Sequence, residues 1–339
     1  MRIVKKIGII TIAVFTISIV TGYVFFRQKN SEKYIGPVAK ISIAYSPFEH
    51  STLLWIADNQ RFFSQNGLDV TLHKYDTGVG SLDGMLDGET DITVGVTEFP
   101  TVGRAFRKSG IGIIGSVAKI DQIYLVGRKD RGIEKASDLK GKKVGTTFRT
   151  VAEFHLGRFL DLHGMNMQDI TLVDVKMPTE WVNAVANGEI DAIATAQPYA
   201  HSAKERLGAN AIFWPAQSSQ PIFGLIVATE EWIGNHPELV TRFLESMVLA
   251  EEFLIRHPAE AQAIVQKELN LDAAYMETVW SQNRFALSLD QSLILAMEDE
   301  ARWMIMNNLT TEKQIPRFLD YINEYSLKAI KPDAVNIIR

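Results

Sequence analysis

Apolar residues along this chain recur in short runs, separated by helical stripes and by turns rich in glycine, proline and asparagine. The runs are typical of buried strands, and the segments between them have the apolar face of amphipathic helices. Strands that alternate with helices predict parallel β-α-β units and open α/β sheets. We expect strands at 39–45, 68–72, 91–96, 111–117 and 123–126, and a second set at 143–146, 171–175, 192–194, 211–214 and 225–228.

This pattern predicts two lobes. The stretch 128–138 is charged and rich in turns, and the alternation of strands and helices restarts after it. The segment 221–228 is expected to return the chain to the first lobe, and from Pro237 onward we expect only helices that pack on that lobe. The first lobe is therefore assigned to 39–126 and 225–339, and the second to 127–224.

Two predicted helices begin where an anion could bind. Thr150 is a good N-cap residue, and Glu153 three positions later completes a capping-box pattern. About 70 residues upstream, Gly80 and Ser81 precede a second helix start. The first turn of a helix has N–H groups without internal partners and the positive end of the helix dipole. Each lobe therefore offers one candidate anion site, although Thr150 could simply cap a structural helix.

Residues 7–26 form an apolar stretch without charge, and Arg2, Lys5 and Lys6 precede it. Twenty residues match a bilayer span, and basic residues before the span favour an N-terminus inside and the rest of the chain outside. We expect 1–29 to be an uncleaved signal anchor, with a cleaved signal peptide as the alternative. The protein would then lie in the periplasm, or otherwise outside the cytoplasm, tethered to the inner membrane.

Composition argues against several classes of protein. Beyond residue 6 the chain has 32 basic and 40 acidic residues, a net charge of −8, which argues against nucleic acid as a partner. The absence of cysteine excludes disulfides, thiolate metal sites and cysteine nucleophiles. The seven histidines lack the spacing of a helical zinc site, and no hydrolase elbow, phosphate loop or dinucleotide fingerprint occurs. We expect no metal, no cofactor and no enzymatic activity.

Sequence motifs that are each weak alone carry a family resemblance through their order and spacing, and three of them illustrate it. They are the AxxxxFFxxxGLDV pattern at 57–70, DLKGKKVG at 138–145, and GEIDA at 188–192 followed by Gln197-Pro198. In order and spacing they resemble the substrate-binding proteins of ABC importers for nitrate, sulfonates, taurine and thiamine-pyrimidine precursors. The resemblance covers about residues 39–310 and implies the two-lobed type II periplasmic-binding-protein fold with open mixed sheets. The sequence departs from that family at 149–150, where relatives often have Gly-Ser.

In open α/β sheets, ligands bind beyond the carboxyl ends of the strands, so residues that follow predicted strands are the candidates. Arg149 could hold an oxyanion with its planar guanidinium, or remain a solvated or lobe-pairing arginine. Glu98 could bind an ammonium group, pair with Arg149 or cap the next helix. The candidate ligand-binding set is Tyr45, Ser46, Gly80, Ser81, Thr97, Glu98, Thr146, Thr147, Arg149, Thr150, Gln197, Tyr199 and Phe223.

Aromatic side chains are candidates for the walls of a small-ligand pocket. Trp181 is expected on a helix, where core packing is its commoner role, and His50 is expected to cap a helix or lie at the surface. The candidate wall residues are Tyr45, Phe48, Trp181, Tyr199 and Phe223.

The resemblance and the candidate residues predict a solute-binding protein that closes around a small organic anion or zwitterion, of the sulfonate or taurine type, and delivers it to ABC permease subunits. One alternative is a membrane-anchored ligand sensor that signals through a separate partner. A second is a protein that binds or synthesises a pyrimidine precursor. The predicted N-terminal span argues against a cytosolic synthase.

Overall fold

The computed structural model describes residues 34–217, 220–271 and 273–339. Val38–Arg339 forms one compact unit, whereas the predicted signal anchor at 7–26 lies outside the described residues. Within the described ranges, no helix is both long enough and apolar enough to cross a membrane.

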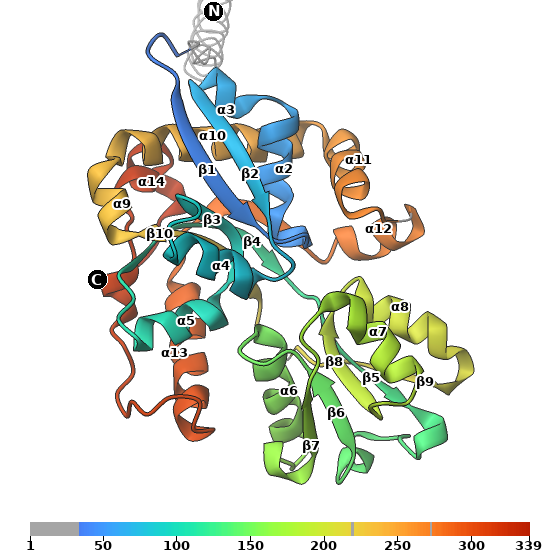
Figure 1. Ribbon diagram of the computed structural model, residues 1–339. Helices are drawn as coiled ribbons and strands as arrows, with labels where there is room; N and C mark the ends of the chain where they lie inside the picture. Colours follow the sequence, from blue (N-terminus) through green and yellow to red (C-terminus); the bar gives the residue numbers. More distant parts are fainter. Residues whose placement is uncertain (1–33, 218–219, 272) are drawn as a thin grey trace, which may run out of the picture. The chain divides into compact units, whose positions relative to one another are not determined.

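Two mixed β-sheets organise residues 38–339 (Figure 1). In each sheet three neighbouring strands pair in parallel, and the remaining neighbours pair antiparallel. The first sheet has the order β11-β4-β10-β3-β1-β2, with β1 (Ala39–Tyr45), β2 (Leu68–Lys74), β3 (Ile92–Thr97), β4 (Ile111–Ile120), β10 (Ile222–Thr229) and β11 (Arg284–Ser288). The second has the order β7-β6-β8-β5-β9, with β5 (Ile123–Arg128), β6 (Lys143–Thr146), β7 (Thr171–Asp174), β8 (Ala192–Ala196) and β9 (Ala211–Pro215).

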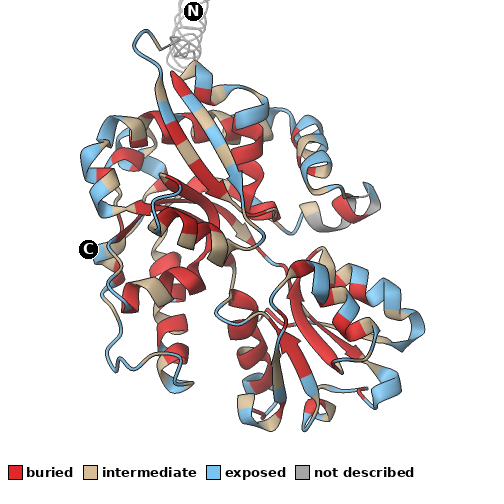
Figure 2. Ribbon diagram, in the orientation of Figure 1, coloured by how far each residue is buried: buried red, intermediate tan, exposed pale blue. Residues whose placement is uncertain are grey.

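Helices pack on both sheets, and Figure 2 shows burial concentrated on the strands and on the helix faces that meet them. In the first lobe, α10 packs on α2 and α13 packs on α5. The helices of this lobe are α2 (Thr52–Asn59), α3 (Phe62–Gln65), α4 (Gly78–Leu86), α5 (Glu98–Phe106), α9 (Glu230–Asn235), α10 (Pro237–Arg256), α11 (Pro258–Leu269), α12 (Ala273–Trp280), α13 (Gln291–Met306) and α14 (Tyr325–Ile330). Those of the second lobe are α6 (Val151–Leu162), α7 (Pro178–Ala186) and α8 (Tyr199–Leu207).

Burial along the strands follows their position in the sheet. Every residue of β3 is buried, as expected for an interior strand that is covered on both faces. The edge strand β2 instead alternates, with exposed or half-buried positions along most of its length. The hydrophobic runs in the sequence therefore predicted the strands, and their degree of alternation reports how each strand is covered.

The chain passes between the lobes earlier than predicted. We expected the strand at 123–126 in the first lobe, but β5 pairs with β8 and β9 of the second sheet. The first crossover therefore lies at 121–122 rather than at 128–138. The return crossover ends at β10, which inserts between β3 and β4. An apolar strand such as β5 has the same periodicity in either sheet, so only its backbone pairing decides which lobe it joins.

The prediction of an all-helical region after Pro237 is wrong at one point. Strand β11 pairs antiparallel with β4 and forms an edge of the first sheet. Its Phe285 and Leu287 are buried, and Ala286 between them is half-buried. This alternation is only five residues long and lies between helical segments, which made it too weak a signal to separate from the helical pattern.

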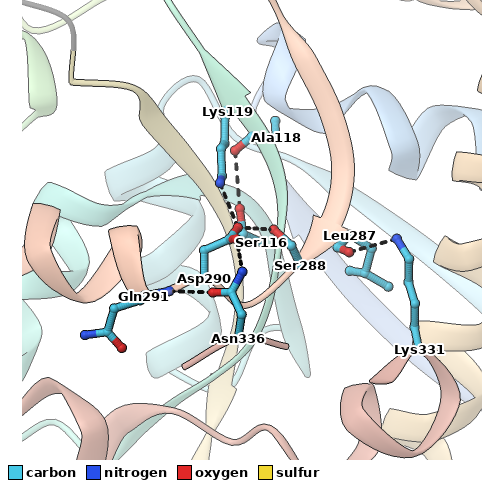
Figure 3. Close-up of polar contacts among 9 residues, drawn as sticks. All are labelled: Ser116, Ala118, Lys119, Leu287, Ser288, Asp290, Gln291, Lys331 and Asn336. Carbon is cyan, nitrogen blue, oxygen red and sulfur yellow. Dashed lines mark hydrogen bonds and ion pairs between the residues drawn. The ribbon is translucent and has the colours of Figure 1, made fainter. Parts of the chain in front are cut away.

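A polar network fixes β11 and the C-terminal tail to the end of β4, as Figure 3 shows. The Asp290 carboxylate lies 2.7 Å from Lys119 Nζ and accepts hydrogen bonds from Ser288 Oγ at 2.7 Å and Asn336 Nδ2 at 3.0 Å. Lys331 Nζ donates to the Leu287 carbonyl at 3.0 Å. Because β4 leads directly into the first crossover, this network lies on the first-lobe side of that crossover.

Candidate ligand-binding site

A small cavity of about 60 Å³ lies between residues of the two lobes. It is lined by the starts of α4 and α6, by the segments that follow β1 and β3, by the end of β8 and by the crossover residues Gln122 and Ile123. These places include carboxyl ends of strands, where open α/β sheets bind their ligands. No Asp, Glu, Lys or Arg is among the lining residues.

The first lobe contributes the start of α4. Thr77 is the N-cap residue, and its Oγ1 accepts a hydrogen bond from Gly80 N at 3.1 Å. Gly78 and Val79 line the cavity, and their N–H groups have no hydrogen-bond partner in the described part of the chain. The helix therefore begins at Gly78, four residues before the predicted 82–86 segment. Its free N–H groups belong to Gly78 and Val79 rather than to the predicted Gly80 and Ser81.

The second lobe contributes the start of α6. Thr150, Val151 and Ala152 line the same cavity. The Thr150 hydroxyl makes no capping bond and donates instead to the Thr147 carbonyl at 2.7 Å. The predicted capping box is therefore wrong in detail, because the Glu153 carboxylate accepts from Arg149 N at 2.7 Å. The first N–H groups of α6 remain available, and the two helix starts meet at one cavity.

Three buried polar atoms at the cavity have no hydrogen-bond partner in the described part of the chain. They are His50 Nδ1, Gln122 Oε1 and Thr195 Oγ1. Burial lowers the pKa of His50 to about 3, so the imidazole is neutral at physiological pH. Its Nε2 lies 3.5 Å from Ser46 Oγ. Because buried polar groups are normally paired, His50 and the Thr195 hydroxyl, which can donate, are the expected contacts of a ligand that accepts hydrogen bonds, whereas the Gln122 oxygen can only accept.

Aromatic side chains from both lobes form a wall of the cavity. Phe48 of the first lobe lies 6.3 Å from Trp181 and 6.2 Å from Tyr199 of the second, measured between ring centroids. Trp181 and Tyr199 meet edge to face at 5.0 Å. Trp181 Nε1 donates to the Val175 carbonyl at 2.9 Å, which fixes the ring. Trp181 is thus packed in the core, as expected, and also lines the cavity together with Phe48.

Of the predicted ligand-binding set, the structure brings Thr97, Thr147 and Thr150 to the cavity. Ser81 is fully buried, donates to the Gly78 carbonyl and accepts from Thr93 Oγ1, both at 3.0 Å, so it supports the helix start rather than lining the cavity. Gly80 also supports that turn.

Glu98 does not line the cavity, and it does not pair with Arg149. It is buried at the start of α5, where its Oε2 accepts from Phe223 N at 3.0 Å, and Glu300 of α13 lies beside it. Burial raises the pKa of Glu98 to about 8, and burial followed by the charge of Glu98 raises that of Glu300. The expectation that Glu98 binds an ammonium group is therefore wrong, because its carboxyl faces the core.

The other members of the set serve the site indirectly or lie away from it. Tyr45 meets Trp55 edge to face, and Thr146 is buried at the end of β6. Lys119 Nζ lies 5.2 Å from the centroid of the Phe223 ring. Ser46 contacts His50, and Gln197 Oε1 accepts from His201 N at the start of α8, at 3.1 Å. Tyr199 reaches the aromatic wall, and Arg149 lines a neighbouring pocket.

Several cavity residues were not predicted. Thr77 followed by Gly78 is an N-cap signal that could have placed the first helix start correctly. His50 was expected at the surface or as a cap, but it is buried against the cavity. Thr195 lies in β8 and Gln122 in the first crossover, and neither has a local sequence signal for ligand binding. They line the cavity only because the two lobes come together around it.

The two sheets and this cavity between them define a two-lobed α/β binding protein. The alkanesulfonate-binding protein SsuA from Xanthomonas axonopodis pv. citri, solved with bound MOPS, matches the fold with a TM-score of 0.74 at 18% sequence identity. The match covers 86% of this chain and 100% of that one. The predicted two-lobed fold with mixed sheets is confirmed.

The chain belongs to the NMT1/THI5-like family, whose model matches residues 48–261. A binding protein of Brucella abortus is 28% identical over 66% of this chain and 69% of its own length. The taurine-binding periplasmic protein of Escherichia coli is 25% identical over 64% of this chain and 67% of its own length. The family resemblance found in the sequence is therefore confirmed.

Proposed function

We propose that this protein is the extracytoplasmic solute-binding component of an ABC importer and that it binds a small organic anion of the sulfonate type. The observation that carries this proposal is the meeting of two helix starts, one from each lobe, at a single cavity. The sulfonate-binding and taurine-binding names of its relatives support the same ligand class. The predicted tether at 7–26 would hold the protein at the membrane beside its permease.

The chemistry of the cavity favours an oxyanion head group. N–H groups at the starts of α4 and α6 are oriented donors at the positive ends of two helix dipoles. The neutral His50 and the Thr195 hydroxyl add donors without a formal charge. Because no acidic side chain lines the cavity, an ammonium group would have no counter-ion there. A plain anion is therefore favoured over a zwitterion.

Ligand binding would stabilise the closed arrangement of the lobes. A solute that accepts hydrogen bonds from Gly78 or Val79 and from Val151 or Ala152 contacts both lobes at once. Its binding energy then favours the conformation in which the two helix starts are close, which is the form a permease would recognise. The Phe48–Trp181–Tyr199 wall joins the lobes on the apolar side of the same cavity.

A binding screen tests the ligand class directly. We expect propanesulfonate to raise the thermal stability of the purified full-length protein, by about 2.7 kcal/mol at ~100-fold its dissociation constant. Taurine, nitrate and an aminopyrimidine are the comparison ligands, and taurine should bind more weakly than propanesulfonate. Stabilisation by the aminopyrimidine alone would refute the oxyanion proposal.

Thr195→Val should raise the stability of the protein and lower its affinity for the ligand. The substitution removes a buried hydroxyl that has no hydrogen-bond partner among the described residues, and it keeps the shape of the side chain. We therefore expect the free energy of unfolding to rise by about 1 kcal/mol and the affinity for the solute to fall by about tenfold, since a ligand hydrogen bond is lost.

Thr90→Val is the matched control for this experiment. Thr90 Oγ1 is also buried without a partner in the described part of the chain, but it lies outside the cavity. This variant should gain stability and keep its affinity for the solute. Equal loss of affinity in both variants would show that Thr195 has no direct contact with the ligand.

A further inference from the structure

A second and larger pocket adjoins the cavity. Its volume is about 640 Å³, and it shares Val79 and Pro100 with the cavity as lining residues. Most of its lining comes from α5, from the end of α13 and from the loop that follows α13. Arg149 completes it from the second lobe. We call it the cationic pocket because four cationic side chains line it, those of Arg104, Arg107, Lys108 and Arg149.

Four cationic side chains and one carboxylate line the cationic pocket. They are Arg104, Arg107, Lys108 and Arg149, against Glu312. Arg104 pairs with Asp83, but in the described ranges no ion pair involves Arg107, Lys108 or Arg149. Burial, and then the charges of Arg107 and Arg149, lower the pKa of Arg104, so these cations lie close enough to repel one another. Such a cluster is stabilised by a bound anion.

Arg149 is held at the border of the two sites by its backbone. Its φ of 61° lies in the left-handed region, which is unfavourable for a residue with a side chain. The hydrogen bond from Arg149 N to Glu153 Oε2, at 2.7 Å, fixes this turn. As a result two consecutive residues line different sites, Arg149 the cationic pocket and Thr150 the cavity.

We propose that the natural solute is a dianion with an anionic group at each end of a short apolar spacer. One group binds at the helix starts in the cavity, the spacer passes Val79 and Pro100, and the second group binds Arg107 and Arg149 in the cationic pocket. Compounds of this class include ω-carboxyalkanesulfonates and alkanedisulfonates. The inference rests on the proposed function and specifies its ligand.

The test compares dianions with monoanions of equal chain length by calorimetry on the full-length protein. At the chain length that fits both sites, the ω-carboxyalkanesulfonate should bind about tenfold more tightly than the alkanesulfonate. This advantage should shrink at high salt, since the second contact is exposed to solvent and is screened. Arg107→Gln, and Arg149→Gly, which also relieves the left-handed backbone, should each remove most of the advantage. Arg107→Gln, at a position away from the start of α6, should also leave alkanesulfonate affinity nearly unchanged.

Arg302→Gln on α13 is the matched control, because Arg302 is exposed and does not line the cationic pocket. It should keep the advantage of the dianion. The inference is overturned if dianions bind no more tightly than monoanions at every chain length, or if the advantage persists in both pocket variants. In either case alkanesulfonate binding would leave the proposed function intact. If neither ligand class binds, the proposed function itself fails.

Discussion

Thr150→Asp is expected to lower the affinity for an anionic solute by about 100-fold or more. The new carboxylate would stand at the start of α6, where the anion is proposed to bind. Two negative charges about 4–5 Å apart repel by roughly 3–4 kcal/mol at an effective dielectric constant of about 20. The fold should be retained, because aspartate is a favourable N-cap residue and its charge complements the helix dipole. Calorimetry with propanesulfonate measures the loss.

Thr150→Asn is the matched control for the charge. Asparagine has nearly the size of aspartate, is an equally good N-cap and carries no charge. Both variants lose the Thr150 hydroxyl bond to the Thr147 carbonyl, so that effect cancels between them. The asparagine variant should bind much more tightly than the aspartate variant. Equal affinities would mean that no anion binds at the start of α6.

Glu300→Gln is expected to change how stability depends on pH. In the folded protein the Glu98 carboxyl has a pKa of about 8, and that of Glu300 is also raised, whereas both lie near 4.5 when unfolded. Below pH 4.5 both states are protonated and the pair does not weaken the fold. Between about pH 4.5 and 8 the unfolded state releases protons that the folded state keeps, so the free energy of unfolding falls. We expect this loss to be on the order of 2–4 kcal/mol.

The Glu300→Gln variant should therefore be more stable than the wild type at pH 8. The difference in the free energy of unfolding between the two proteins should become small near pH 4.5. Denaturant unfolding at several pH values measures it. Glu298→Gln, on the same helix but paired with Arg302 at the surface, should follow the wild-type profile. If Glu300→Gln and the wild type lose stability in parallel up to pH 8, then Glu300 does not contribute to the pH dependence of the free energy of unfolding.

Local patterns in the sequence were sufficient to predict most of the fold. The strands at 111–120 and 192–196 are short, largely apolar runs, because strands covered on both faces need apolar residues along most of their length. The strand at 39–45 instead alternates between buried and more exposed positions. The helix start at Thr150 was predicted from N-cap chemistry, and that helix begins at Val151. The family motifs at 57–70, 138–145 and 188–192 were enough to predict the family.

The sequence did not predict where the charged candidates would lie, although it did predict three threonines that line the ligand cavity, Thr97, Thr147 and Thr150. Glu98 and Arg149 are both charged and both follow strands, so they looked alike as candidates. Glu98 is buried against Glu300, some 200 positions away in sequence, and Arg149 faces α5 of the other lobe. Distant contacts of this kind leave no local signal.

Some sequence signals act over only a few positions, namely hydrophobic periodicity, cap residues and turn residues. These local signals were enough to predict the helices and strands of this protein, their order and its family. Backbone pairing between distant strands decided that β5 joins the second sheet and that β11 closes the first. The packing of one lobe on the other decided that two helix starts face one cavity while Arg149 faces a separate cationic pocket. These outcomes depend on long-range contacts, whose energies appear only when the whole chain is folded.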